Sequence, residues 1–337
     1  MAENQTPRQL VKNLLQGIAP QRPLFLPIVF ARGARIENLA FRDFLSSPQK
    51  IFNSLRQIRG HLRSDGITCY FDPLLEAEEL GAEAQWDASG AHRLLRWPLH
   101  DPSSEFAAEM PDEPKGSRVV VAVEVIRRLK AVTREDCLLT AGITGPITLA
   151  AQLMHLDLAN PLRYADILSS TLDLTASAVS GIARAFVEAG ANVIFLREDV
   201  TPILSDEDAE DWSSRLGTAL NIVRFYEALP VLLLTSPLAN PEALETIAAQ
   251  SWDCVVCFSL DEVSAEQIAT ISRMGPGKAG IALPINWFES GATETASSEL
   301  LRQAVSEILP AIVTTAGDMP ASGDFERLKR MWEDMRQ

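Results

Sequence analysis

Eight short apolar segments, separated by stretches of helical periodicity, constrain the fold of this chain more than any other feature. They occupy residues 23–30, 66–71, 136–142, 192–198, 230–236, 253–259, 279–285 and 311–317. Most run on with few polar residues, which is typical of parallel strands covered on both faces and not of strands with one solvated face. Strands that alternate with helices predict right-handed βαβ units.

Eight such units in 337 residues predict a single α/β domain, a (β/α)8 TIM barrel spanning residues 1–337. A doubly wound open sheet is the alternative, but no G-x-G-x-x-G or G-x-x-x-x-G-K-[ST] motif follows a strand to favour it. We expect an N-terminal amphipathic helix at about residues 5–19. Residues 84–116 have loop composition, and we expect either a flap over the barrel mouth or a solvated excursion.

The charge, the apolar runs and the cysteine content of the chain limit which partners and which cellular locations are expected. The net charge is −15, which argues against nucleic acid and against an anionic membrane surface, because no excess of cations exists to neutralise phosphates. The chain has no uninterrupted apolar run long enough to span a bilayer and no signal-peptide core near its start. Four cysteines make no disulfide framework, so a cytoplasmic location is expected. Cys254 and Cys257 fall in one strand on opposite faces and are predicted to be core residues.

Candidate site residues follow from the barrel, because TIM-barrel chemistry lies at the carboxyl ends of the strands. Arginines and carboxylates converge there, which suits a small polar or anionic molecule. None of the four histidines is at such an end, and no His/Cys cluster has zinc-site spacing, so we expect no metal. The residues at these ends are Arg32, Arg35, Asp72, 140–144, Arg197, Glu198, Asp199, Thr235, Ser236, Ser259, Asp261, Asn286 and 314–318.

Several of these positions also have an ordinary structural interpretation. Asp72 before Pro73 is a helix N-cap followed by a first helical residue. Under this interpretation, we expect the acidic residues Glu76, Glu78 and Glu79 to be first-turn, solvent-facing groups of that helix. Gly145 begins a turn whose following amides open a helix and would attract an anion.

Four segments of the chain resemble the uroporphyrinogen decarboxylase superfamily, whose members are single (β/α)8 barrels. RPLFLPIVFARGARIENLAFRDFLSSPQK resembles the arginine loop of that family, and DGITCYFDPLLEAEELGAE resembles its strand-two aspartate motif. TGPITLAAQL resembles its Gly-Pro-x-Thr turn, and TTAGDMPASGDFERLKRMWE resembles its last strand and C-terminal helix. The superfamily contains metal-free porphyrinogen decarboxylases and zinc-dependent corrinoid:thiol methyltransferases. The E-A-E-x-L-G-A wording is closer to the methyltransferases.

The decarboxylase resemblance implies that Asp72 is the catalytic carboxylate, which stabilises positive charge on a protonated pyrrole. The loop arginines would hold substrate carboxylates. With the strand-end groups, the expected substrate-binding residues are Arg32, Arg35, Arg42, Gly145, Gln152, Asp199 and Asn286. The chain departs from the decarboxylases where their tyrosine falls on Gln152, their serine on Asp199, and their C-terminal histidine near Ala316 and Gly317.

The methyltransferase resemblance implies a zinc site built from a His-x-Cys after strand five and a cysteine after strand eight. Here the matching positions are Leu234, Ser236 and Gly317, none of which is a good zinc ligand. The alternative cofactors under this interpretation are cobalamin or tetrahydrofolate as methyl carriers, and the alternative partner is a corrinoid protein.

Taken together, the sequence favours a metal-free, cofactor-free decarboxylase-like enzyme for a small anionic substrate, either a polycarboxylate or a tetrapyrrole-like molecule. A corrinoid- or folate-linked methyltransferase or demethylase without the zinc triad is the alternative. A non-catalytic ligand-binding or partner subunit is a third. The sequence is compatible with a homodimer.

Overall fold

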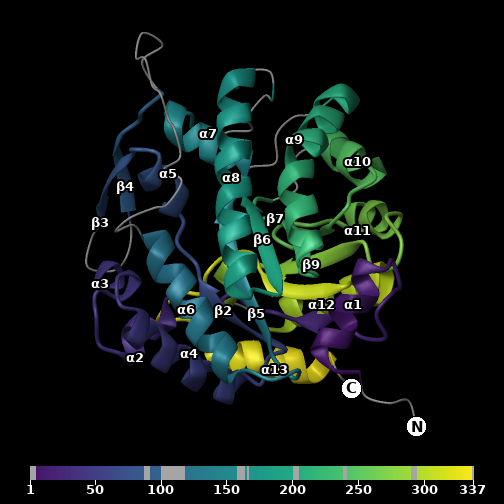
Figure 1. The fold of residues 1–337 in the computed structure, drawn as a ribbon. Helices are drawn as coiled ribbons and strands as arrows, with labels where there is room; N and C mark the ends of the chain where they lie inside the picture. Colours follow the sequence, from purple (N-terminus) through teal and green to yellow (C-terminus); the bar gives the residue numbers. More distant parts are fainter. Residues whose placement is uncertain are drawn as a thin grey trace.

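Eight parallel strands ringed by helices form a nearly closed barrel (Figure 1). This computed structural model describes residues 5–86, 92–99, 118–157, 164, 167–199, 205–237, 241–289 and 294–335. Each of the eight apolar segments overlaps one barrel strand, so the predicted TIM barrel is confirmed. The strands are β1 (Leu24–Phe25), β2 (Gly66–Tyr70), β5 (Leu138–Thr144), β6 (Val193–Glu198), β7 (Leu229–Leu234), β8 (Val255–Ser259), β9 (Ala279–Leu283) and β10 (Ile312–Thr315).

The strand order excludes the open doubly wound sheet. Neighbours run β1-β10-β9-β8-β7-β6-β5-β2, so the order along the chain is kept around the ring, and the last strand pairs with the first. The remaining gap lies between β1 and β2. There the Asp65 amide donates to the Phe25 carbonyl at 3.0 Å, and the Thr68 hydroxyl donates to the Pro27 carbonyl at 3.2 Å. These two bonds hold the strands together where no ladder forms.

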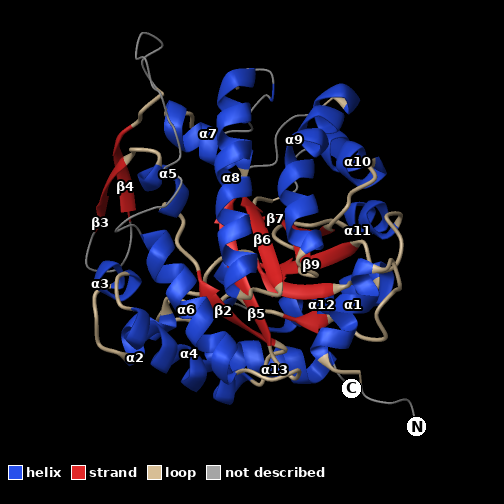
Figure 2. Cartoon of the chain, viewed as in Figure 1, coloured by secondary structure: helices blue, strands red, loops and turns tan. Residues whose placement is uncertain are grey.

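Helices form the outer layer, as Figure 2 shows by colour. The predicted N-terminal helix is present as α1, closed by a capping box in which Thr6 and Gln9 exchange hydrogen bonds. It ends before residue 19, and Gly17 follows with φ of 73°. The helices are α1 (Pro7–Leu15), α2 (Arg32–Ile36), α3 (Phe41–Leu45), α4 (Pro48–Leu62), α5 (Leu75–Glu79), α6 (Arg118–Val132), α7 (Pro146–Met154), α8 (Ser169–Ala189), α9 (Asp206–Phe225), α10 (Pro241–Ala249), α11 (Ala265–Ser272), α12 (Glu294–Ile308) and α13 (Phe325–Met335), with a 3-10 turn η2 (Ile285–Phe288).

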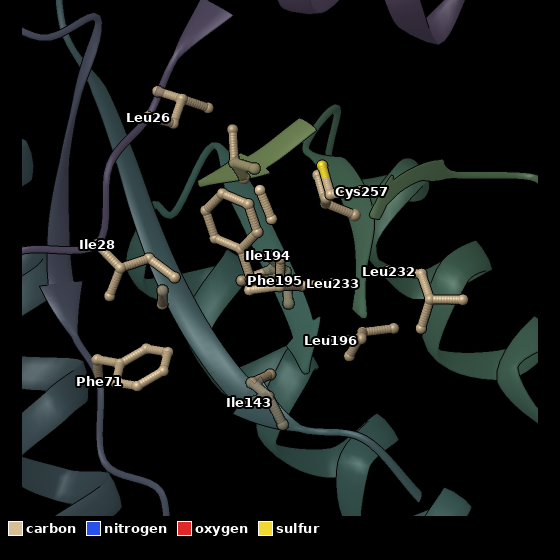
Figure 3. Close-up of a cluster of buried hydrophobic side chains, with 14 of the residues drawn as sticks. Leu26, Ile28, Phe71, Ile143, Ile194, Phe195, Leu196, Leu232, Leu233 and Cys257 are labelled. Atoms are coloured by element: carbon tan, nitrogen blue, oxygen red, sulfur yellow. The ribbon is translucent and has the colours of Figure 1, made fainter. Parts of the chain in front are cut away.

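Apolar side chains from successive strands fill the barrel (Figure 3). Phe195 and Leu233 are buried there, and Phe71 follows β2 into the same region. Cys254 and Cys257 are buried free thiols, as predicted, and burial raises the pKa of Cys254 to about 12. A filled interior leaves the strand ends as the place for chemistry.

Part of the predicted excursion at 84–116 is a β-hairpin outside the barrel (Figure 1). Its strands are β3 (Glu83–Trp86) and β4 (His92–Arg96), paired antiparallel. The Trp86 ring packs against Phe41, with 6.0 Å between ring centroids. The rest of the proposed flap, residues 87–91 and 100–116, lies outside the described residues. Within the described part of the chain, no helix has the length and apolar character needed to cross a bilayer.

Candidate active site

Asp72 lies directly beyond the carboxyl end of β2, and its side chain is fully buried. One carboxylate oxygen accepts from the Leu74 amide at 3.1 Å, and the other is 2.8 Å from Arg118 Nε. Burial raises the pKa of Asp72 to about 6, while Arg118 lowers it. The predicted N-cap is displaced, because α5 begins at Leu75 and Asp72 instead closes the turn before it.

Arg118 is the first residue of α6 and was not among the sequence candidates. It pairs with Asp72 and with Glu78 of α5, and its guanidinium carbon lies 5.8 Å from the centroid of the Trp86 ring. Its side chain is 16% exposed, whereas that of Asp72 is 0% exposed. The arginine therefore neutralises Asp72 and covers it at the same time.

The carbonyl of Pro73 fixes the turn that carries Asp72. It accepts from Gln152 Nε2 at 3.1 Å, from an Arg197 guanidinium nitrogen at 3.3 Å and from the Thr144 hydroxyl at 3.5 Å. These donors come from α7, β6 and β5, so three neighbouring elements converge on the residue after Asp72. Gln152 Oε1 is buried without a hydrogen-bond partner.

Glu76 is fully buried, which contradicts its prediction as a solvent-facing acid. The reason is that α5 packs on β5 and α7, so its first turn faces the barrel rim. Burial raises the pKa of Glu76 to about 7, opposed by the neighbouring Thr144 hydroxyl and Arg197 and increased by the Asp72 charge. The Thr144 hydroxyl is directed to the Pro73 carbonyl, and neither Glu76 oxygen has a partner of hydrogen-bond geometry.

Asp199 and Arg197 form a second ion pair at this rim. Arg197 Nε lies 3.2 Å from Asp199 Oδ1, which also accepts from the Thr235 hydroxyl at 3.1 Å. Arg197 is buried beside Phe71, with its guanidinium carbon 5.5 Å from the ring centroid. Thus each of the two rim arginines has its own carboxylate partner.

The amides that open α7, which were predicted to attract an anion, bind the carboxylate of Glu198. Its two oxygens accept from Ile147 N at 3.1 Å and Thr148 N at 2.7 Å, and the Thr148 hydroxyl adds a third bond at 2.6 Å. A Cβ on Gly145 would lie 2.4 Å from this carboxyl group, so only glycine fits there. Burial raises the pKa of Glu198 to about 7, against these three bonds.

The loop arginines lie on the side of the C-terminal segment. Arg32 and Arg35 both donate to the Ala321 carbonyl, at 3.3 Å and 3.2 Å, and Arg32 stacks over the ring of Phe325 in α13. Arg42 is exposed on α3. Asn286 is exposed on η2, where its amide donates to Asp261 Oδ1 at 3.2 Å. The cation that contacts Asp72 is therefore Arg118 from α6 and none of the predicted arginines.

The positions matched to the zinc triad do not fit a metal. Leu234 is a buried side chain of β7, Ser236 donates to the Asp199 carbonyl, and Gly317 has no side chain. Across the described ranges, no group of three or more His, Cys, Asp or Glu side chains is arranged to hold a metal ion.

As a whole, the rim between β2, β5 and β6 holds buried carboxyl groups in unequal environments. Asp72 has a direct cationic partner, while Glu76 has none within hydrogen-bonding distance. Pairs of acids whose surroundings separate their pKa values are suited to acid–base chemistry, one as a fixed anion and the other as a carrier of a proton.

Comparisons with known proteins agree with the fold. The solved structure of a methyltransferase from Methanosarcina mazei superposes with a TM-score of 0.75 over 98% of both chains, at 15% identity. A B12-independent methionine synthase from Shewanella sp. W3-18-1 superposes with a TM-score of 0.54 over 88% of this chain and 89% of that chain, at 12% identity. At these identities the likeness concerns the fold alone.

Among characterised proteins, the Methylcobamide:CoM methyltransferase MtaA of Methanosarcina barkeri is 30% identical over 134 residues. This match covers 39% of the present chain and 40% of the relative, so less than half of the relative's length is aligned. The sequence model described as Uroporphyrinogen decarboxylase (URO-D) matches residues 6–265. The chain belongs to the uroporphyrinogen decarboxylase (URO-D) family.

Proposed function

We propose that this chain is a methyltransferase that moves a methyl group between a methylcobamide and a small polar acceptor. The relative with 30% identity, the Methylcobamide:CoM methyltransferase MtaA, supports this choice over decarboxylation. The observation that carries the proposal is the buried pair of Asp72 and Arg118, with 2.8 Å between Oδ2 and Nε, because it separates the two activities of the superfamily.

Decarboxylation of a pyrrole side chain needs an anion that faces the substrate and meets the positive charge of the protonated ring. Asp72 already has a guanidinium as its counter-ion, and its side chain is 0% exposed. A carboxylate compensated in this way loses much of its stabilising effect on a new cation. The arginines that would hold the substrate carboxylates are bound to Ala321.

The residues of the rim can bind and deprotonate a small acceptor. Gln152 Oε1 and the two oxygens of Glu76 are buried acceptors that could receive hydrogen bonds from N–H, O–H or S–H groups. Methylcobamide is a second substrate in this proposal. The chain's own task is to orient the acceptor and to manage its proton.

The test is incubation with methylcobalamin or methyltetrahydrofolate and a panel of thiols, alcohols and amines, with product detection by mass spectrometry. We expect methylated product from at least one acceptor with methylcobalamin. Binding of these compounds, seen as thermal stabilisation, without product from any donor would refute the proposal and support a ligand-binding subunit.

A porphyrinogen decarboxylase is the second candidate, because Asp72 follows the second barrel strand, where the family resemblance places the catalytic carboxylate. Asp72→Asn should then abolish carbon dioxide release from a porphyrinogen carboxylate. Unchanged release in that variant would exclude this role of Asp72.

A further inference from the structure

Glu76 is the group at the rim that the packing of the fold does not explain. Its carboxyl is fully buried, and both oxygens are without a hydrogen-bond partner. An unpaired buried carboxyl costs more free energy than a buried apolar side chain of the same size, so its presence at a strand end points to a use. The helix that carries it, α5, packs on two neighbouring elements, which fixes the position of the carboxyl.

The charged groups that face Glu76 are Asp72 from its own segment and Arg197 from β6. The first of these is neutralised by Arg118 at 2.8 Å, and the second is engaged by Asp199 at 3.2 Å. Thr144 from β5 and Gln152 from α7 are the neutral polar groups of the same cluster, because both donate to the Pro73 carbonyl with Arg197. No cation of this cluster is committed to Glu76.

We infer that Glu76 is the general acid–base residue of the site, and that it exchanges a proton with the acceptor while Asp72, held by Arg118, stays a fixed anion. This inference rests on the proposed methyl transfer. It also names the acceptor class, which is a small molecule with an ionisable S–H, O–H or N–H group. Arg118 is the member of the Asp72–Arg118 pair that reaches the surface, with a side chain that is 16% exposed.

In the methylating direction, the acceptor X–H loses a proton and gains the methyl group. The X–H bond of the acceptor breaks and its proton goes to a Glu76 carboxylate oxygen. The electron pair left on X forms the X–CH3 bond, while the carbon–cobalt bond of methylcobamide breaks and leaves its electron pair on cobalt. Glu76 then releases the proton to water. The reverse direction, demethylation of X–CH3, requires Glu76 to supply the proton.

In this inference Glu76 activates the acceptor, which is the function of zinc in the methyltransferases of the superfamily. Zinc would lower the pKa of the acceptor thiol, but Leu234, Ser236 and Gly317 offer no ligands for it. A carboxyl whose burial raises its pKa to about 7 is poised to accept a proton near neutral pH.

The test begins with pH-difference infrared spectroscopy of the whole protein, which observes protonated carboxyl groups directly and needs no substrate. We compare wild type with Glu76→Gln and with Glu79→Gln, a matched control on the same helix. Burial also raises the pKa values of Glu198 and Asp318 to about 7, so their carboxylic-acid signal should be lost over the same pH range in every variant. The signal lost as the pH rises through about 7 should therefore be smaller by one carboxyl group in Glu76→Gln than in wild type, and should keep its wild-type size in Glu79→Gln. Thr144→Val keeps Glu76 but removes the neighbouring hydroxyl that lowers its pKa, so the midpoint of the infrared titration should move to higher pH. This variant provides the answer if Glu76→Gln does not fold.

The second readout is the pH profile of methyl transfer. In wild type and Glu79→Gln, kcat/KM should rise with pH through about 7 in the methylating direction. In Glu76→Gln this limb should vanish and kcat should fall about 10²–10⁴-fold, the usual range for general base catalysis, while methylcobalamin binding persists.

The outcomes separate the inference from the proposed function. A Glu76-dependent band without methyl transfer to any acceptor would refute the function and, with it, the assignment of Glu76 as its base. Methyl transfer with an unchanged rate and pH profile in Glu76→Gln would refute the inference and leave the function standing. If neither Glu76→Gln nor Thr144→Val changes the infrared titration, Glu76 holds no proton near neutral pH and the inference fails.

Discussion

Substitution of Glu76 by glutamine should remove part of the decrease in the free energy of unfolding that wild type shows as the pH rises. The pKa of Glu76 is raised from 4.5 to about 7 by burial, so the unfolded chain loses this proton at lower pH than the folded protein does. The stability contributed by the protonated group is thus fully present below pH 4.5 and is lost as the pH rises through about 7. Each pKa unit corresponds to about 1.4 kcal/mol, so the loss amounts to about 3 kcal/mol.

The assay is urea unfolding followed by circular dichroism at about pH 5 and about pH 8, with ΔG extrapolated to water. Glutamine cannot ionise, so the difference in ΔG of unfolding between Glu76→Gln and wild type should shift by about 3 kcal/mol in favour of the variant at the higher pH. Other buried carboxyl groups titrate in both proteins and cancel in this difference.

Glu79→Gln serves as the control, because it makes the same chemical change on the same helix. Glu79 is half-buried whereas Glu76 is fully buried, so the difference between Glu79→Gln and wild type should change less between the two pH values than that of Glu76→Gln. An equal difference at both pH values for Glu76→Gln would show that the folded and unfolded chains ionise Glu76 alike, and would refute the reasoning from burial.

Three further changes test the packing of the rim. Arg118→Ala should destabilise the protein by about 3–5 kcal/mol at neutral pH, because it leaves Asp72 buried without its cation. Adding Asp72→Asn to this variant should restore part of the lost stability, and urea unfolding of the single and double variants measures both effects. Gly145→Ala should cost about 1–3 kcal/mol, since its Cβ would lie 2.4 Å from the Glu198 carboxyl, and an unchanged melting temperature would contradict this packing. Asp318→Ala should cost about 2 kcal/mol, because two backbone amides of the loop before α2 lose their acceptor, as thermal unfolding can establish.

The barrel could be read from the sequence because its strands are buried on both faces. Runs such as 230–236 contain almost no polar residue, and the corresponding strand β7 is buried along its whole length. The alternation with capped helices then leaves few topologies. The hairpin of β3 and β4 was not predicted, since its exposed side chains lack the apolar pattern of the barrel strands.

The location of Asp72 was also predictable, because a residue just after a strand of a barrel lies at its carboxyl rim. The counter-ion of Asp72 was not predictable. Arg118, the first residue of α6, lies far from Asp72 in the sequence, and no local spacing indicates that the two side chains meet. Glu76 was wrongly predicted as solvent-facing. On a helix as short as α5, the face that turns inward depends on its packing against β5 and α7, which a window of five residues cannot specify.

The central claim is that two neighbouring acids at one strand end hold different protonation states. Neutron diffraction from crystals kept at about pH 6.5, between the pKa values of about 6 for Asp72 and about 7 for Glu76, observes this directly. We expect a higher deuteron occupancy on the Glu76 oxygens than on the Asp72 oxygens, with Arg118 still in contact with Asp72. A deuteron on Asp72 and a bare Glu76 carboxylate would contradict it.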